Sequence, residues 1–409
     1  MASNDLLLSF PNDIVHNIME KLPLKSIVRS KLFNKEWQNC IRNSDFVQHH
    51  LKHSLKNSEN NALLFFKSGT SLYFVDDLSI SPPRPINLPI PSTSQYISIV
   101  GSCNGVICIE VGSFSKSYIL INPTNPTVFE TIDFSLSHIF CNVKLKHNPN
   151  FFVTIVSGFG YDDKNDDYKI VYIWSWKNDK NSVKIRGMIY CLKLGKWKTL
   201  HPPNVGTSWN YCGIVNNCLH FVTESNNVII SFDLHEEKWG EVNFPDIKAK
   251  YEVKEVSIFE GCLSVLIKTW IYHELWVMKQ YGITKSWTRL LILPIPETCR
   301  VLFYSTRVQK YLLSVNCRRL VWYNEVDESI EEVKIDGKLD IDDFRMVIGS
   351  LVPIQFKMLD HHLSRERKGL FGGQDDGDTG ECREGSKQRR SKKCRTKTQY
   401  ARVIFRKEL

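Results

Sequence analysis

The feature that most constrains the fold is a repeat of short strand-like segments between residues 62 and 355. Runs rich in β-branched and aromatic residues, such as "GVICIE", "YKIVYIW" and "VIISFDL", alternate with turn residues. The residues that close one recurring strand are Asp76, Asn122, Lys193, Asp233, Met278 and Asn324. They are 46, 71, 40, 45 and 46 residues apart. Units of 40–50 residues with several strands each are typical of a β-propeller, so we predict an all-β domain of about six blades.

Two details refine this prediction. The spacing of 71 indicates one repeat plus an insertion, which we place within residues 131–155. A tryptophan follows the turn after the recurring strand in three units, at Trp197, Trp239 and Trp287. A large aromatic side chain at that position can fill the gap between neighbouring blades. A β-sandwich with coincidental spacing is the alternative fold.

The chain before the repeat has a helical period instead. Its first apolar stripe consists of Ile14, Val15, Ile18, Met19 and Leu22. Pro11 suits a first helical turn, and Pro23 ends the helix because proline lacks a backbone donor and disfavours a helical residue before it.

Three more short helices are expected in this region. One starts near Lys25, one holds Trp37, and one begins at "DFVQHHL" with Asp45 as its N-cap. A unit of about 40 residues has a thin core and is usually marginal alone. Its apolar stripe is wider than the unit can bury, so we predict a docking module.

The C-terminal region has a third character. Residues 357–409 hold 15 Lys and Arg against 8 Asp and Glu, which places most of the net charge of +9 there. Few aliphatic residues and dense charge predict a disordered tail over residues 356–409. Its basic run is a candidate nuclear localisation signal, with a non-specific nucleic-acid patch or a solvated tail as the alternatives. The cations of this run are Lys387, Arg389, Arg390, Lys392, Lys393, Arg395 and Lys397.

Composition excludes several classes of function. The body of the chain is nearly neutral, so nucleic acid is not an expected partner. The longest apolar runs, such as "LLILPI", are far shorter than the ~18 residues of a membrane span. The twelve cysteines form no CxxC pair and no secretion signal is evident, so we expect reduced thiols in the cytoplasm, the nucleus or both.

No pattern of catalytic or cofactor-binding residues stands out. The motifs GxGxxG, GxxxxGK[ST], HExxH and GxSxG are absent, and no cofactor is expected. His49 and His53 share a helical face but lack a third ligand, so no metal site is predicted. The segment "YDDKNDDY" lacks the central glycine and final glutamate of a calcium loop. We interpret it as a solvated hairpin tip.

The N-terminal segment "FPNDIVHNIMEKLPLKSIVRSKLFNKEWQNCIRNSDFVQHHL" resembles an F-box over residues 8–51. The positions that carry the resemblance are Phe10, Pro11, Asp13, Ile14, Val15, Leu22, Pro23, Leu24, Ser26, Ile27, Val28, Arg29, Lys35 and Trp37. After a linker at residues 52–61, residues 62–355 resemble the F-box-associated domain of plant F-box proteins. The phrases "GSCNGVICI", "INPTNPT", "GFGYDDKNDDYKIV" and "GIVNNCLHFV" carry this second resemblance.

The resemblance implies a non-catalytic substrate receptor of an SCF ubiquitin ligase. Its partners would be the Skp adaptor, a cullin through that adaptor, and an unknown target protein held by the β-domain. The implied adaptor-binding residues are Phe10, Pro11, Ile14, Val15, Ile18, Leu22, Pro23, Leu24, Ile27, Val28, Leu32 and Trp37. Two alternatives stay open: a scaffold that binds the adaptor without a degraded substrate, and a propeller hydrolase or lyase, which needs convergent carboxylates at the central mouth.

Overall fold

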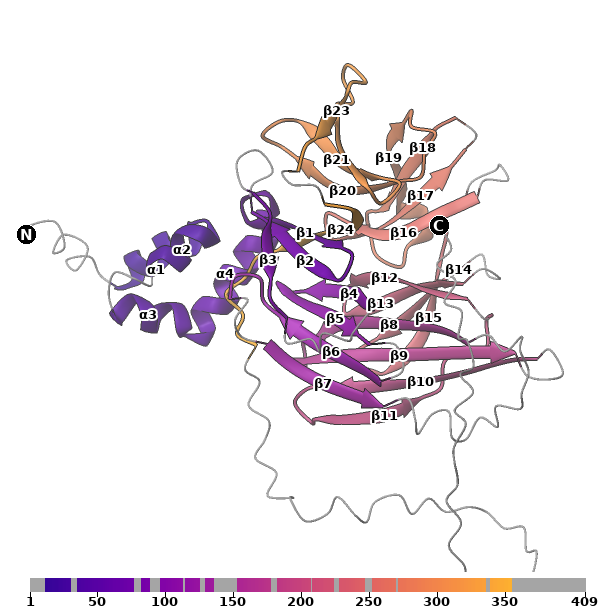
Figure 1. The fold of residues 1–409 in the computed structure, drawn as a ribbon, viewed down its shortest axis with the longest axis horizontal. Coiled ribbons are helices and arrows are strands. Elements are labelled where there is room, and N and C mark those ends of the chain that lie inside the picture. The colour runs from indigo at the N-terminus through magenta and orange to yellow at the C-terminus, as the bar shows by residue number, and fades with distance from the viewer. Residues whose placement is uncertain are drawn as a thin grey trace, which may run out of the picture.

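The computed structural model describes residues 12–354, apart from the short segments 31–34, 77–81, 89–95, 113–114, 126–128, 136–152, 178–181, 207, 224–227, 247–251, 270 and 336–338. Four helices at one side of a β-propeller make up the N-terminal part (Figure 1). They are α1 (Asn12–Lys21), α2 (Leu24–Ser30), α3 (Lys35–Arg42) and α4 (Ser44–Lys56), followed by a 3₁₀ turn, η2 (Ser58–Asn61). None of the described helices is both long and apolar enough to cross a membrane.

The helix boundaries agree with the expected breaks, with one correction. Pro23 separates α1 from α2, as the sequence predicts. The N-cap of α4 is Asn43, not Asp45: the Asn43 side chain accepts hydrogen bonds from the backbone N–H groups of Asp45 and Phe46, at 2.8 and 3.2 Å. Asparagine caps as well as aspartate does, and Asp45 instead lies in the first turn, where its charge complements the helix dipole.

Six antiparallel sheets of four strands confirm the predicted propeller. From the inner to the outer strand, blade 1 is β24 (Ile341–Ile348), β1 (Ala62–Ser68), β2 (Ser71–Val75) and β3 (Arg84–Ile86). Blade 2 is β4 (Ile97–Cys103), β5 (Val106–Val111), β6 (Ser115–Ile121) and β7 (Phe129–Ser135). Blade 3 is β8 (Val153–Asp162), β9 (Asp167–Lys177), β10 (Val183–Cys191) and β11 (Lys196–Leu200).

The other three blades follow the same order. Blade 4 is β12 (Trp209–Val215), β13 (Cys218–Thr223), β14 (Val228–Asp233) and β15 (Lys238–Asn243). Blade 5 is β16 (Glu252–Phe259), β17 (Cys262–Lys268), β18 (His273–Met278) and β19 (Trp287–Leu293). Blade 6 is β20 (Cys299–Ser305), β21 (Lys310–Val315), β22 (Arg319–Tyr323) and β23 (Ile330–Val333).

The repeat positions found in the sequence all mark the same place in the blades. Five of the six residues end, or directly follow, the third strand of their blade, and Lys193 is the second residue after the third strand of blade 3. Part of the long spacing between Asn122 and Lys193 comes from blade 3, whose first three strands have 10, 11 and 9 residues. Most of the remaining insertion falls in residues 136–152, outside the described part.

The core consists of apolar clusters between neighbouring blades. Trp197 of blade 3 packs on Phe134 of blade 2, with ring centroids 4.5 Å apart. Trp287 of blade 5 donates a hydrogen bond to the Asn243 carbonyl of blade 4, at 3.0 Å. Trp239 borders the cluster shared by blades 3 and 4. The three tryptophans therefore fill the places that the sequence analysis assigned to them.

The last strand closes the ring. The last strand of the β-domain, β24, pairs with its first strand, β1, so blade 1 contains both ends of this domain. The following segment, residues 349–354, which we call the strap, then crosses onto blade 2. There the Asn122 side chain donates hydrogen bonds to the carbonyls of Ser350 and Val352, at 3.0 and 2.8 Å.

Candidate functional site

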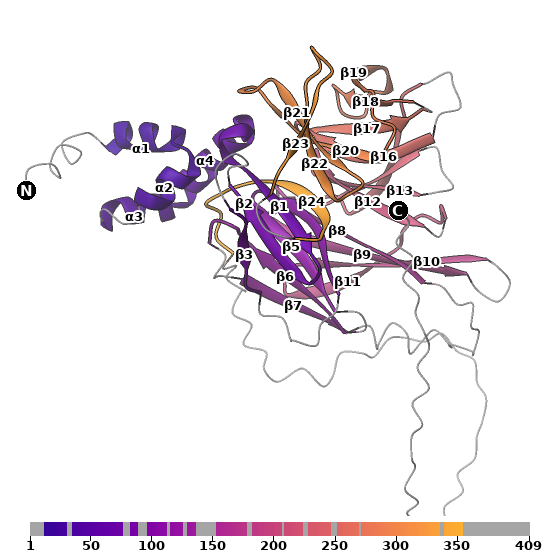
Figure 2. The ribbon, with the colours of Figure 1, turned by 45° about the horizontal axis from the view of Figure 1, so that its top comes forward.

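An exposed apolar pair lies on α1. Ile14 and Ile18 are 44% and 52% exposed, and four residues along a helix place them on one face. On another side of the same helix, Met19 is buried against Ile27 and Phe46. Helices α1, α2 and α3 extend away from the propeller, with α4 nearest to it (Figures 1 and 2). The pair is therefore open to a partner on a helix that extends away from the propeller.

Two of the predicted adaptor-binding residues are not on the surface. Leu24 is only 6% exposed and Ile27 is fully buried. Ile27 forms the small helical core with Met19, Ile41 and Phe46. The expectation that Leu24 and Ile27 contact a partner directly is therefore corrected: both pack inside the molecule, since a unit this small needs its central aliphatic side chains for its own core.

The other predicted residues divide between the surface and the undescribed part. Pro23 is exposed, and Leu22 and Val28 are partly buried. Phe10, Pro11 and Leu32 lie outside the described residues, and for Val15 and Trp37 only the helix position is described. The seven cations of the basic run, Lys387 to Lys397, also lie outside the described residues, with the whole of residues 355–409.

The helices are joined to the propeller by packing and hydrogen bonds. Leu351 of the strap packs against the helical core. The Leu24 N–H donates to the Asn61 side chain at 2.9 Å, and the Gly349 N–H donates to the Asn61 carbonyl at 2.7 Å. Residues 52–61, which we expected to be a linker, are the end of α4 and η2. The strap thus contacts the helical part and blade 2 at once.

Glu59 in η2 makes a second connection. Its carboxylate accepts hydrogen bonds from the hydroxyls of Ser305 and Thr306 and from the backbone N–H groups of Thr306 and Arg307, at the end of β20 and in the turn that follows it. Burial would raise the pKa of Glu59, but these hydrogen bonds to the ionised form outweigh it and lower the pKa. The charged carboxylate therefore clamps the end of the helical part onto blade 6.

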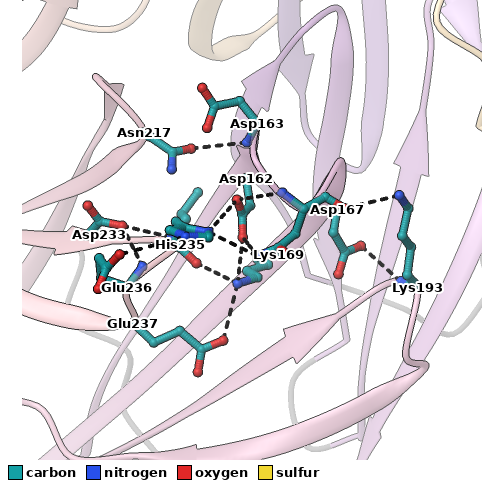
Figure 3. A network of polar contacts seen from close by, with 12 residues as sticks. Asp162, Asp163, Asp167, Lys169, Lys193, Asn217, Asp233, His235, Glu236 and Glu237 are labelled. Atoms are coloured by element: carbon teal, nitrogen blue, oxygen red, sulfur yellow. Dashed lines mark hydrogen bonds and ion pairs between the residues drawn. The ribbon is translucent and has the colours of Figure 1, made fainter.

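The aspartate-rich segment forms a hairpin tip between β8 and β9, but it is not solvated throughout. Asp162 is fully buried and Asp167 is 5% exposed. Figure 3 shows Asp162 beside Lys169 of the same blade, with Nζ and Oδ2 3.0 Å apart. Lys169 also contacts the Leu234 carbonyl and, at 3.2 Å, the Glu237 carboxylate of blade 4. The prediction of a solvated tip is wrong for these two aspartates, since buried charges persist where they are paired.

The hydrogen bonds of this network favour charged side chains. Burial acts to raise the pKa of Asp162, yet hydrogen bonds from Asn165 and Lys169 lower it overall. The pKa of Lys169 is raised, because its contacts with Asp162 and Glu237 outweigh desolvation. Asp167 is the exception: burial raises its pKa, although its carboxylate accepts a hydrogen bond from the Lys193 N–H at 2.9 Å. The network ties blade 3 to blade 4 and has a structural role.

The inner strands carry a second charged group. Arg300 on β20 contacts Glu255 on β16 and Asp343 on β24, the latter at 3.2 Å. Arg345 contacts the same Asp343 at 3.2 Å. Two carboxylates paired with arginines are not the convergent carboxylates that a propeller hydrolase or lyase requires. Among the described residues, no cluster of three or more His, Cys, Asp or Glu side chains could hold a metal ion.

Comparison with known families agrees with both resemblances. Residues 7–49 match the model of the F-box domain. Residues 68–348, more than half of the chain, match the F-box associated beta propeller domain.

Curated proteins of Arabidopsis thaliana are similar over most of their length. F-box protein CPR1 is 25% identical in sequence, and the alignment covers 84% of this chain and 89% of CPR1. F-box protein At4g22390 is also 25% identical, with coverage of 80% and 86%. F-box/kelch-repeat protein At3g23880 is 27% identical, with coverage of 70% and 80%.

Proposed function

Since the chain belongs to the F-box proteins that carry an F-box associated beta propeller domain, we propose that it is a substrate receptor of an SCF ubiquitin ligase. Its F-box binds the Skp adaptor, and through it a cullin. Its propeller holds a target protein, which is ubiquitinated and then degraded. The receptor itself has no catalytic group in this proposal. It raises the effective concentration of the target near the ubiquitin-loaded conjugating enzyme.

The observation that carries this proposal is the exposed pair Ile14 and Ile18 on the outward helix of the F-box region. An amphipathic helix with apolar residues one turn apart suits docking into an apolar groove of the adaptor. The strap and the Glu59 clamp support the proposal further, because they hold that helix in one orientation relative to the propeller. A receptor with such a connection presents its target in a defined position.

The test is co-purification of the full chain with the Skp adaptor. We expect Ile14→Asp with Ile18→Asp to weaken adaptor binding at least tenfold, about 1.4 kcal/mol or more, because two carboxylates would be desolvated in an apolar contact. The dissociation constant is measured by titration calorimetry. Because both side chains are exposed, the double variant keeps the thermal midpoint of the wild type.

A matched control places the same charges on exposed apolar residues of the propeller. Ile271 and Val326 are 71% and 91% exposed, and Ile271→Asp with Val326→Asp leaves adaptor binding unchanged. Equal adaptor affinity of the wild type and the α1 double variant would contradict the proposal. Accumulation of bound proteins on proteasome inhibition separates a degrading receptor from a scaffold that only occupies the adaptor.

A further inference from the structure

Blade 3 has a step in its outer edge. Strand β11 pairs with β10 only from Gly187 to Cys191, whereas β10 pairs with β9 along its whole length, from Val183. Among the described residues, no strand pairs with the outer edge of β10 between Val183 and Arg186. In Figures 1 and 2, β9 and β10 extend past the end of β11.

The sequence after β11 explains the step. Pro202 and Pro203 follow Leu200 and His201, and proline has no N–H group to donate to a neighbouring strand. The chain therefore leaves the sheet at this point. Pro202 packs over Gly187, where a Cβ atom would lie 2.9 Å from the proline Cγ. The outer backbone groups of Val183–Arg186 are left as an open edge, which is the usual template for an added strand.

A cationic depression lies at the step. It has a volume of about 310 Å³, and its lining includes Trp176, Lys184, Arg186 and His201. Lys184 and Arg186 are exposed and point to the same face, since they are two residues apart on one strand. Neither forms an ion pair with a described residue, and no carboxylate lines the depression. An occupant with negative charge at alternate positions would complement both cations.

We propose that this edge binds an extended acidic segment of the target protein by strand addition. The backbone of the segment would pair with Val183–Arg186 in line with β11. Its acidic side chains, spaced by two residues, would face Lys184 and Arg186. Main-chain pairing supplies affinity in this recognition mode, and the alternate side chains supply specificity. The inference rests on the proposed receptor function and names the chemistry of the target.

The test uses the full chain and a fluorescent peptide with the sequence Thr-Glu-Val-Glu-Val-Glu-Thr. We expect saturable binding in fluorescence anisotropy. Lys184→Glu with Arg186→Glu weakens it about tenfold, because two opposite-charge cross-strand pairs become like-charge pairs. Lys196→Glu with Lys198→Glu is the matched control, since it reverses two exposed cations at the same spacing on β11. The control leaves the affinity within twofold.

A second pair of probes separates strand addition from charge attraction alone. Peptides with N-methyl groups on alternate amides, in either register, lose backbone donors but keep their charge. We expect one of the two registers to bind at least tenfold more weakly. The inference is overturned if neither register loses affinity, if no saturable binding occurs, or if the control reversal weakens binding as much as the reversal on β10. The inference would also be overturned if the wild-type protein forms a dimer and the Lys184→Glu, Arg186→Glu variant is a monomer. The edge would then bind a second copy of this chain.

The adaptor titration is repeated on the same preparations. All four charge-reversed positions lie in blade 3, so adaptor affinity stays at the wild-type value. Loss of peptide binding with intact adaptor binding overturns only this inference. Peptide binding without adaptor binding overturns only the proposed receptor function.

Discussion

At the scale of single residues, the turn between β4 and β5 shows how local and distant constraints meet. Asn104 and Gly105 have φ values of 53° and 79°, as expected for an Asn-Gly hairpin turn. A Cβ atom on Gly105 would lie 2.3 Å from the Ser350 Oγ and 2.8 Å from the Ile348 carbonyl oxygen. Position 105 therefore requires glycine for two reasons: the positive φ of the turn and the close approach of the strap.

Substitution at this turn separates the two requirements. Gly261 has a φ of 73° in the β16–β17 turn, and nothing lies within 4 Å of the position that a Cβ atom would take there. We expect Gly261→Ala to lower the free energy of unfolding by about 1 kcal/mol, for the conformation alone. Gly105→Ala should lower it by about 2–4 kcal/mol, because the strap must also move. Urea denaturation measures both, and equal losses would show that the strap contact contributes nothing.

At the scale of elements, a buried ion pair within blade 3 takes part in the junction with blade 4, because Lys169 also contacts the Leu234 carbonyl and the Glu237 carboxylate of blade 4. Asp162 and Lys169 have side chains that are 0% and 4% exposed. Removing one partner of such a pair leaves an uncompensated charge, which costs more than the pair itself contributes. The hairpin tip that looks hydrophilic in the sequence is therefore a structural joint.

Substitution of Lys169 tests this joint. We expect Lys169→Met to lower the free energy of unfolding by about 3 kcal/mol, because Asp162 loses its buried cation. Adding Asp162→Asn should restore part of that loss. Lys193→Met is the control: its ion pair with Asp166 is largely exposed, so a loss under about 1 kcal/mol is expected. Urea unfolding that ranks the two lysine variants equally would refute the assigned role.

At the scale of the whole molecule, three contacts orient the helical part on the propeller. Leu351 enters the helical core, Asn61 connects Leu24 to Gly349, and Glu59 binds the turn after β20. These contacts link the N-terminal helices to blade 6 and to the strap that follows the last strand. Under the proposed function, fixed orientation of this kind would keep the adaptor-binding helix and the blade that holds the target at a constant separation.

The Glu59 contact predicts a pH dependence of stability. Because folding lowers the pKa of Glu59, its stabilising effect is complete above the unfolded value of about 4.3 and is lost as the pH falls through the folded value. We expect Glu59→Gln to lower the free energy of unfolding by about 1–2 kcal/mol at pH 7, and the difference from the wild type to shrink below pH ~4. Thermal unfolding at both pH values measures it. Glu331→Gln, on an exposed pair with Lys310, should change stability by less than ~0.5 kcal/mol at either pH.

Much of the architecture can be predicted from the sequence because it depends on local periodicity. The spacing from Asp76 to Asn324 predicted the blades, and the tryptophans predicted where blades meet. Which residues of the adaptor-binding set are exposed could not be predicted, since the helical period marks an apolar stripe but does not tell which of its members are buried. Ile14 and Ile27 have the same hydrophobic character, yet one is exposed and the other is in the core.

The repeat of β-strands, the helices before it and the break at Pro23 follow from the sequence alone, because strand and helix periods and proline are local properties of the chain. Folding in three dimensions sets which apolar residues stay exposed, which aspartates are buried, and how the helices lie on the ring. Those features depend on contacts between residues far apart in sequence, such as Glu59 with Thr306 or Asn122 with Ser350. Each such contact has its stabilising effect only after ring closure has brought its partners together.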